Sequence, residues 1–152
     1  MSFRAAVEAR DLDAMVAALA PDVVVHSPIS RFVRFEGRPR ARELFQEVLA
    51  TFEDIHYTDE LRGDGVVVYL LRARVRGREI EETAVLRYDD AGLVREMRIF
   101  IRPMPGLAAV AAALGPRLAR RRGRLRAAVV TAFTRPLVVL LSAGDRASAR
   151  IV

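Results

Sequence analysis

The chain of 152 residues contains no cysteine, no lysine and no asparagine, and its two histidines are His26 and His56. Without cysteine it forms no disulfide and has no thiolate, and two histidines are too few for the usual zinc sites. We therefore expect no metal and no other cofactor. Because the basic residues are all arginine, the arginine content indicates a codon bias toward G and C. It gives little support to nucleic-acid binding, and we expect none.

The beginning of the chain, MSFRAAVEARDLDAMV, has acidic residues where a secretory signal needs an apolar core. This pattern predicts a cytoplasmic protein. A chain of this length is expected to form one domain with an appendage. Residues 1–103 carry 16 arginines against 18 acidic residues, a balance of −2, whereas residues 104–152 carry nine arginines against one acidic residue, a balance of +8. The sequence therefore divides into a body, 1–103, and a basic extension, 104–152.

Three β-rich runs follow one another in the second half of the body, over residues 66–76, 79–88 and 93–102. The joints between them are short, and each contains a glycine, Gly77 or Gly92, where a positive φ is expected. Such runs predict an antiparallel meander, and one face of that meander has to be covered.

The first half of the body supplies elements that can cover this face. Residues 3–20 predict two helical pieces, the second capped by Asp11 and ended by Pro21. A short strand follows over 22–28, and residues 41–52 carry a clear apolar helical stripe. We expect this helix to pack on the concave face of the meander. Residues 55–61 alternate and predict a fourth strand.

This order of elements, with the segments DLDAMVAALAPDVVVHSP, GRPRARELFQEVLATF and LRYDDAGLVREMRIF, resembles the NTF2-like superfamily. Within it, the resemblance is to the SnoaL-like and ketosteroid-isomerase-like proteins, over about residues 3–103. It implies an α+β fold, a cone made by a curved antiparallel sheet wrapped on N-terminal helices, here with a C-terminal helical extension. That fold holds isomerases, cyclases, hydrolases and binding proteins without activity, so function has to be argued from the site.

The same resemblance suggests where a catalytic base would lie. In ketosteroid isomerases the base is an Asp after the first strand, in a pattern like EDP, and the matching segment here is His26-Ser27-Pro28. We therefore place His26 in the position of the base. The family's two oxyanion donors, a Tyr and an Asp, correspond to Phe3 and Ala84, which donate no hydrogen bond from their side chains. Activity as a ketosteroid isomerase is therefore not expected.

Strand alternation predicts which side chains face the inside of the cone. If Ala84 points inward, Glu82 does too, and we expect Glu82 to orient His26 or to act as an acid. A shift of one residue would instead put Glu81 and Thr83 inside. The expected wall of the ligand site is mainly apolar, as in sites for small molecules. It consists of Tyr69, Leu71, Ala84, Tyr88, Met97 and Ile99.

The basic extension has apolar helical stripes interrupted at Gly115-Pro116 and again at Arg135-Pro136. The apolar run over 127–143 is expected to be too short and too interrupted to span a membrane. We expect these helices to pack on the outer face of the sheet or on a second subunit. The alternative is a basic amphipathic segment on an anionic membrane surface, making a peripheral contact.

Together these patterns predict a protein that binds a small hydrophobic molecule inside the cone and forms a homodimer through its sheet. In the enzymatic version, His26 acts as the base of an isomerase, cyclase or hydrolase type of reaction. The alternative is a protein without activity, a ligand-binding or structural dimer whose cone is filled by its own side chains or by the extension. An open cavity with polar groups would distinguish the two.

Overall fold

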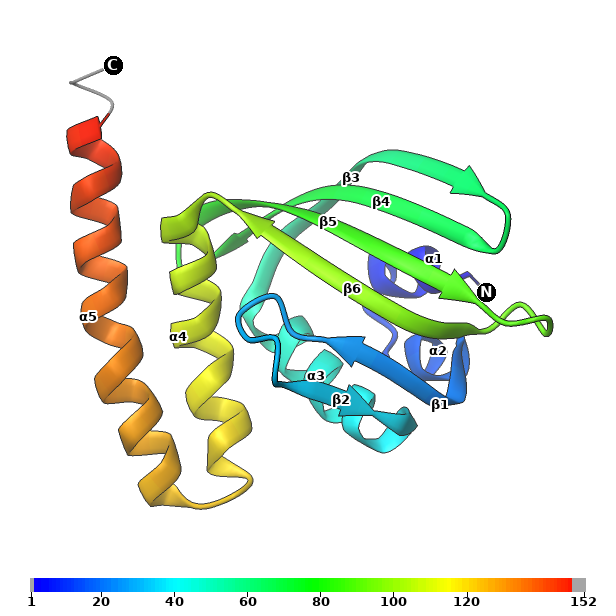
Figure 1. The fold of residues 1–152 in the computed structure, drawn as a ribbon, viewed down its shortest axis with the longest axis horizontal. Helices are drawn as coiled ribbons and strands as arrows, with labels where there is room; N and C mark the ends of the chain where they lie inside the picture. The colour runs from blue at the N-terminus through cyan, green and yellow to red at the C-terminus, as the bar shows by residue number, and fades with distance from the viewer. Residues whose placement is uncertain (1, 149–152) are drawn as a thin grey trace.

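The computed structural model describes residues 2–148, with side chains described as far as Gly144. It has one curved six-stranded sheet with helices on its inner side, and a two-helix hairpin at the end of the chain (Figure 1). This is the predicted α+β cone with a helical extension. The elements in chain order are α1 (Phe3–Glu8), α2 (Leu12–Ala17), β1 (Leu19–His26), β2 (Arg34–Glu36), α3 (Gly37–Thr51), β3 (Phe52–Gly63), β4 (Val66–Val75), β5 (Arg78–Tyr88), β6 (Val94–Arg102), α4 (Met104–Arg120) and α5 (Arg124–Ser148).

The three β-rich runs of the sequence form β4, β5 and β6, which pair one after the other and antiparallel, as predicted. Strand β3 extends this meander on one side, and β1 adds to β6 in parallel on the other, so that the order is β2-β1-β6-β5-β4-β3. Gly77 and Gly92 in the joints have φ of 73° and 75°. Glycine adopts this left-handed region without the steric cost that a Cβ imposes.

The N-terminal helices end earlier than the sequence suggested. Asp11 caps α2 as predicted, because its Oδ1 accepts a hydrogen bond of 2.9 Å from the backbone N–H of Ala14. Helix α2 ends at Ala17, however, since Leu19 pairs with Val94 and begins β1. The expectation of helix up to residue 20 was therefore wrong, and Pro21 lies within a strand.

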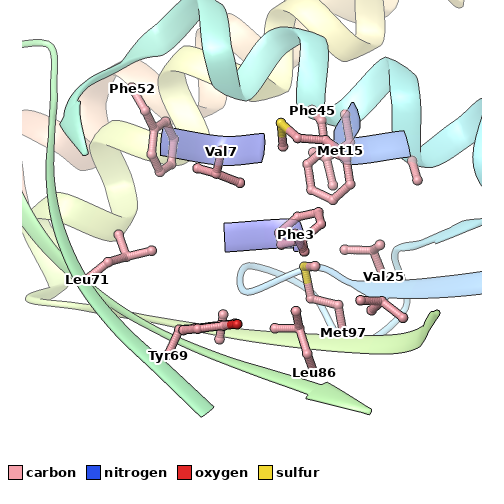
Figure 2. Close-up of a cluster of buried hydrophobic side chains, with 14 of the residues drawn as sticks. Phe3, Val7, Met15, Val25, Phe45, Phe52, Tyr69, Leu71, Leu86 and Met97 are labelled. Atoms are coloured by element: carbon pink, nitrogen blue, oxygen red, sulfur yellow. The ribbon is translucent and has the colours of Figure 1, made fainter. Parts of the chain in front are cut away.

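Side chains from the helices and from the sheet meet in one hydrophobic cluster. Figure 2 shows Phe3, Met15 and Phe45 from the helices facing Leu86 and Met97 from the sheet. The rings of Phe3 and Phe45 lie 5.4 Å apart between centroids. The backbone of α3 lies closest to β1, α4 and α2, while its Leu44 and Phe45 join the meander residues Leu86 and Met97 in this cluster. Helix α3 therefore packs on the meander through side chains, and other helices share the same face.

Helix α4 stands across the open end of the sheet, and α5 lies on its outer side (Figure 1). Val110, Ala113 and Leu114 of α4 belong to the same cluster as the sheet core. The approach is close, because a Cβ on Gly106 would lie 2.7 Å from Cγ2 of Ile80. The extension therefore closes the cone instead of packing on the outer face of the sheet.

The two prolines of the extension do not end its helices. Pro116 lies inside α4 and Pro136 inside α5, and the chain reverses instead at residues 121–123. Because α5 continues through Pro136, its segment Arg124–Gly144 is long and apolar enough to cross a membrane by length and composition. This corrects the expectation that the run was too short. Residues 149–152 of the predicted extension lie outside the described residues.

Candidate functional site

The inside of the cone holds a cavity of about 760 Å³. This volume is in the range of sites for small molecules. Each layer of the fold contributes apolar side chains to its wall: Phe3, Val7, Met15, Leu44, Phe45, Val48, Tyr57, Tyr69, Leu71, Ala84, Leu86, Met97, Ile99, Ile101, Val110, Leu114 and Leu118. Charged side chains at its boundary come mainly from the segment around β2 and α3 and from the α4–α5 turn: Arg34, Arg40, Glu43, Arg122 and Arg126. The cavity is therefore an apolar chamber with a charged rim.

Glu82 is the carboxyl group inside this chamber. It lies on β5 between Leu71 of β4 and Ile101 of β6, so its cross-strand neighbours are hydrocarbon side chains. Among the residues that the structure describes, Glu82 has no hydrogen-bond or ion-pair partner. Burial raises its pKa from an ordinary 4.5 to about 7. The side chain can therefore hold or release a proton near neutral pH.

Two tyrosine side chains share the wall with Glu82. The ring of Tyr57 on β3 meets the ring of Tyr69 on β4 edge to face, with 5.4 Å between centroids. Arg4 covers the ring of Tyr57 at 4.9 Å and also donates a hydrogen bond of 3.1 Å to Glu60. Burial is the main cause that raises the pKa of both tyrosines. Both hydroxyls therefore stay protonated at neutral pH and remain hydrogen-bond donors.

His26 faces away from this chamber. Val23 and Val25 of β1 are buried, so alternation turns His26 toward the outer face of the sheet. There its Nε2 lies 3.0 Å from Oε1 of Glu96. His26 also borders the rim of the cavity, at the beginning of the loop over residues 27–33. The hydrogen bond to Glu96 and the strand alternation both place the imidazole on the outer face, so the structure does not bring His26 and Glu82 together.

The outer face around His26 forms a small charged network. Partial burial acts to raise the pKa of Glu96, but hydrogen bonding and charge from Arg98, together with His26, outweigh it and lower that pKa. Arg98 donates from Nε at 3.0 Å, and Arg87 lies 3.5 Å away. A carboxylate with three cationic or polar partners holds the imidazole in place. This arrangement indicates a structural role for His26 rather than the role of a catalytic base.

Of the predicted wall residues, Tyr69, Leu71, Ala84, Met97 and Ile99 line the cavity. Tyr88 does not line it. It faces a second hollow of about 640 Å³ near Val67 and Leu93, so its placement in the ligand site was wrong. Tyr88 lies at the last position of β5, and its hydroxyl is hydrogen-bonded to that of Tyr69, which also lines the second hollow. The binding and catalytic roles of the residues that do line the cavity stay predictions.

The sequence analysis missed two parts of the wall. Tyr57 is one, although the alternation of residues 55–61 already placed it on one face with Ile55. Helix α4 is the other, through Val110, Leu114 and Leu118. Their helical spacing indicated an apolar stripe, but nothing local indicated that the stripe closes the cone. Among the described residues, no group of three or more His, Asp or Glu side chains is arranged to hold a metal ion.

Comparisons with known proteins agree with this geometry. Residues 2–97 match the family model of the SnoaL-like domain. The chain is 34% identical to the crystal structure of a steroid delta-isomerase from Pseudomonas aeruginosa, with a TM-score of 0.72 over 79% of this chain and 88% of that one. No curated protein sequence matches the chain.

Two more distant structures share the fold. A putative ketosteroid isomerase from Kribbella flavida DSM 17836 is 20% identical, with a TM-score of 0.58 over 64% of this chain and 70% of that one. A putative SnoaL-like polyketide cyclase from Shewanella denitrificans OS-217 is 12% identical, with a TM-score of 0.56 over 66% and 85%. With the curved sheet, the inner cavity and the match over 2–97 all pointing the same way, the chain belongs to the SnoaL-like family of NTF2-like proteins.

Proposed function

We propose that the cavity binds a small apolar molecule and that Glu82 moves a proton on it, in an isomerase or cyclase type of reaction. One observation carries this proposal: a carboxyl group without a partner among the described residues faces an apolar chamber, and its pKa is about 7. A structural carboxylate is normally paired or solvated. An acid or base is most effective when its pKa lies near the working pH.

The step that fits this geometry is transfer of a proton in a β,γ-unsaturated ketone, from the carbon next to the carbonyl group (α) to the γ carbon. Ionised Glu82 takes a proton from one carbon, the electron pair moves toward the carbonyl oxygen, and the double bond shifts. Glu82 then delivers a proton to the γ carbon, and this proton exchanges with water while the carboxyl holds it, so no atom or electron is gained or lost overall. The hydroxyl of Tyr57, on which the charge of Glu82 acts, is the candidate donor for the developing oxyanion, because the hydroxyl of Tyr69 is hydrogen-bonded to that of Tyr88.

The steroid delta-isomerase that is 34% identical supports the type of reaction. The name of that protein is a less direct guide to the substrate of this chain. The two positions where the family resemblance implies oxyanion donors hold Ala84 and Phe3, which is 6% exposed and packed in the core against Phe45. We therefore propose that the donor in this chain is Tyr57 of β3. The proposal also moves the proton-transferring role from His26, which is bound to Glu96, to Glu82.

A second candidate is a carrier that binds the ligand without changing it. The absence of a donor at Phe3 and Ala84 favours it, because a lone carboxyl gives only part of the usual rate acceleration. The volume of about 760 Å³ supports both candidates over a cone filled by its own side chains.

The test compares Glu82→Gln with Glu81→Gln, which lies on the opposite face of the same strand and pairs with Arg72 at 3.2 Å. A steroid ketone with a β,γ double bond serves as the probe. Calorimetry measures its binding, and mass spectrometry measures deuterium taken up from D₂O. We expect exchange in the wild type and in Glu81→Gln, and a loss of about 100-fold or more in Glu82→Gln with similar affinity.

Other outcomes separate the candidates. Binding by all three proteins with no exchange in any of them favours the carrier. Equal exchange by the wild type and Glu82→Gln contradicts the role of Glu82. A probe that binds none of the three, tested together with smaller and larger apolar ketones, contradicts ligand binding in the cavity.

A further inference from the structure

The last described helix, α5, turns its largest apolar side chains toward solvent. Leu125, Phe133, Val139 and Leu140 are between 67% and 80% exposed. The segment Arg124–Gly144 has a mean hydropathy of 1.6, and only 11% of it is buried. A surface helix of a protein in water normally does the reverse and turns such residues to the core.

The face of α5 that packs on α4 combines hydroxyl residues with small and aliphatic ones such as Ala127 and Val130. The main element that α5 contacts is α4, and the buried or half-buried positions of α5 include Thr131, Thr134 and Ser142. Each hydroxyl donates a hydrogen bond to the carbonyl four residues earlier. The packing is close, because a Cβ on Gly115 of α4 would lie 2.9 Å from Cγ1 of Val130. Small and hydroxyl residues at a helix contact, with large apolar residues outward, are typical of helices that face lipid.

Positive charge gathers at the beginning of the same helix. Arg117 in the last turn of α4 and Arg121, which follows the helix as its C-cap, bind Glu47 of α3 at 3.3 and 3.2 Å. Four other arginines of this region make no ion pair with any residue in the described part of the chain: Arg120, Arg122, Arg124 and Arg126. Arginine beside an exposed apolar helix complements the phosphate groups of anionic lipids.

We propose that the outer face of α5 lies on an anionic phospholipid bilayer, with the arginines of the α4–α5 turn at the lipid headgroups. Helical spacing puts Leu125, Phe133 and Leu140 along one stripe and Arg135 at its side, as in helices that lie in the plane of the interface. A spanning helix would bury Arg135 in hydrocarbon, which is costly. A second copy on this face would bring another segment with a balance of +8 alongside the first.

The same surface continues to the mouth of the cavity. Leu125 and Val129 of α5 border the cavity, and so do Ile29 and Phe32 of the loop after β1, of which Phe32 is 80% exposed. A molecule dissolved in the bilayer could therefore enter without crossing water. This part of the inference rests on the proposed function, and it assigns to the cavity a substrate that partitions into membranes.

The test uses the full chain with vesicles of phosphatidylcholine alone or mixed with phosphatidylglycerol. We expect the protein to sediment with the mixed vesicles and to be released when NaCl rises from about 0.1 M to about 1 M, since salt screens headgroup attraction. The double variant Phe133→Asp/Leu140→Asp should bind about tenfold more weakly or worse. The matched control is Phe100→Asp, which changes an apolar side chain of β6 that is 59% exposed and distant in sequence from α5. Circular dichroism checks that the variants are folded.

Three results would overturn this inference: no sedimentation, equal sedimentation of the double variant and the control, or sedimentation that resists high salt. If the wild type forms a stable dimer and binds no vesicles, and the double variant is a monomer, the outer face of α5 contacts a second copy instead. Ketone binding measured without vesicles is a separate readout. If the protein binds vesicles but no ketone, the proposed function is contradicted and the membrane contact stands. If it binds the ketone but no vesicles, only the membrane contact is contradicted.

Discussion

Glu82 of β5 lies directly opposite Leu71 of β4 in the sheet, so a carboxyl group and a leucine side chain share one face of the cone. On its other side Glu82 pairs with Ile101 of β6. In this surrounding the charged form of the carboxyl loses water and gains no partner among the described residues. That loss is the physical cause of the raised pKa of Glu82, about 7.

The first prediction concerns stability against pH. The unfolded chain releases the proton of Glu82 near 4.5, whereas the folded chain keeps it until about 7. Between these values the folded state binds more protons, so the free energy of unfolding falls as pH rises, by about 3 kcal/mol in total. Glu82→Gln removes this loss. Urea unfolding at about pH 4.5 and about pH 8 should show a smaller decrease for Glu82→Gln than for the wild type.

Glu81→Gln provides the control for this measurement. Its carboxyl is exposed on the outer face, beside Arg72 and Arg102, and every other titrating group is common to both variants. A decrease of stability with pH that is the same in Glu82→Gln and Glu81→Gln would contradict the unpaired state of Glu82 in the apolar chamber.

The second prediction concerns His26. Because its imidazole is bound to Glu96 on the outer face, His26→Ala should change proton exchange on a bound ketone by no more than about twofold. A general base would instead lower that rate by about 100-fold or more. The same variant should cost about 1 kcal/mol of stability, since Glu96 loses one hydrogen bond and keeps Arg98 and Arg87. A large loss of exchange with unchanged melting temperature would restore His26 as the base.

The sequence predicted the meander and the inward position of Glu82 because alternation within a long strand has a period of two residues and is read over many positions. His26 was placed by resemblance instead, and alternation from the buried Val23 and Val25 turns it outward. Read letter by letter, the Asp of the EDP pattern falls on Ser27, and Ser27 Oγ accepts a hydrogen bond of 3.2 Å from the backbone N–H of Ile29.

The role of the extension could not be read from local patterns either. Pro116 and Pro136 looked like helix ends, yet both lie inside helices. That α4 closes the cone depends on contacts between residues far apart in sequence, such as Gly106 with Ile80. Homodimerisation through the sheet and a cytoplasmic location stay predictions.

The third prediction tests this closure. Gly106→Ala adds a Cβ that would lie 2.7 Å from Cγ2 of Ile80 and 3.2 Å from the carbonyl oxygen of Glu79. Since the backbone of β5 cannot move freely, the variant should lose about 1 to 3 kcal/mol of stability, despite the better helix propensity of alanine. Gly115→Ala is the matched comparison, because its Cβ would meet only a side-chain methyl of Val130 on the outer helix. The stability loss of Gly115→Ala, measured by urea unfolding, should be smaller than that of Gly106→Ala. A Gly106→Ala variant that is more stable than the wild type would contradict the close approach of Gly106 to Ile80.

The fourth prediction separates the two helices of the extension. Val110 and Leu114 of α4 are in the core, whereas α5 packs mainly on α4 and leaves most of its apolar side chains exposed. Removing residues 124–152 should therefore change the melting temperature by only a few degrees and increase solubility. Removing residues 104–152 should also expose the core face, at a cost of about 3 to 6 kcal/mol for those two side chains. That cost corresponds to a fall of about 10 °C or more, together with increased binding of a hydrophobic dye. If both truncated chains melt at the same temperature, α4 does not close the cone; if both melt far below the full chain, α5 contributes more to stability than its exposure indicates.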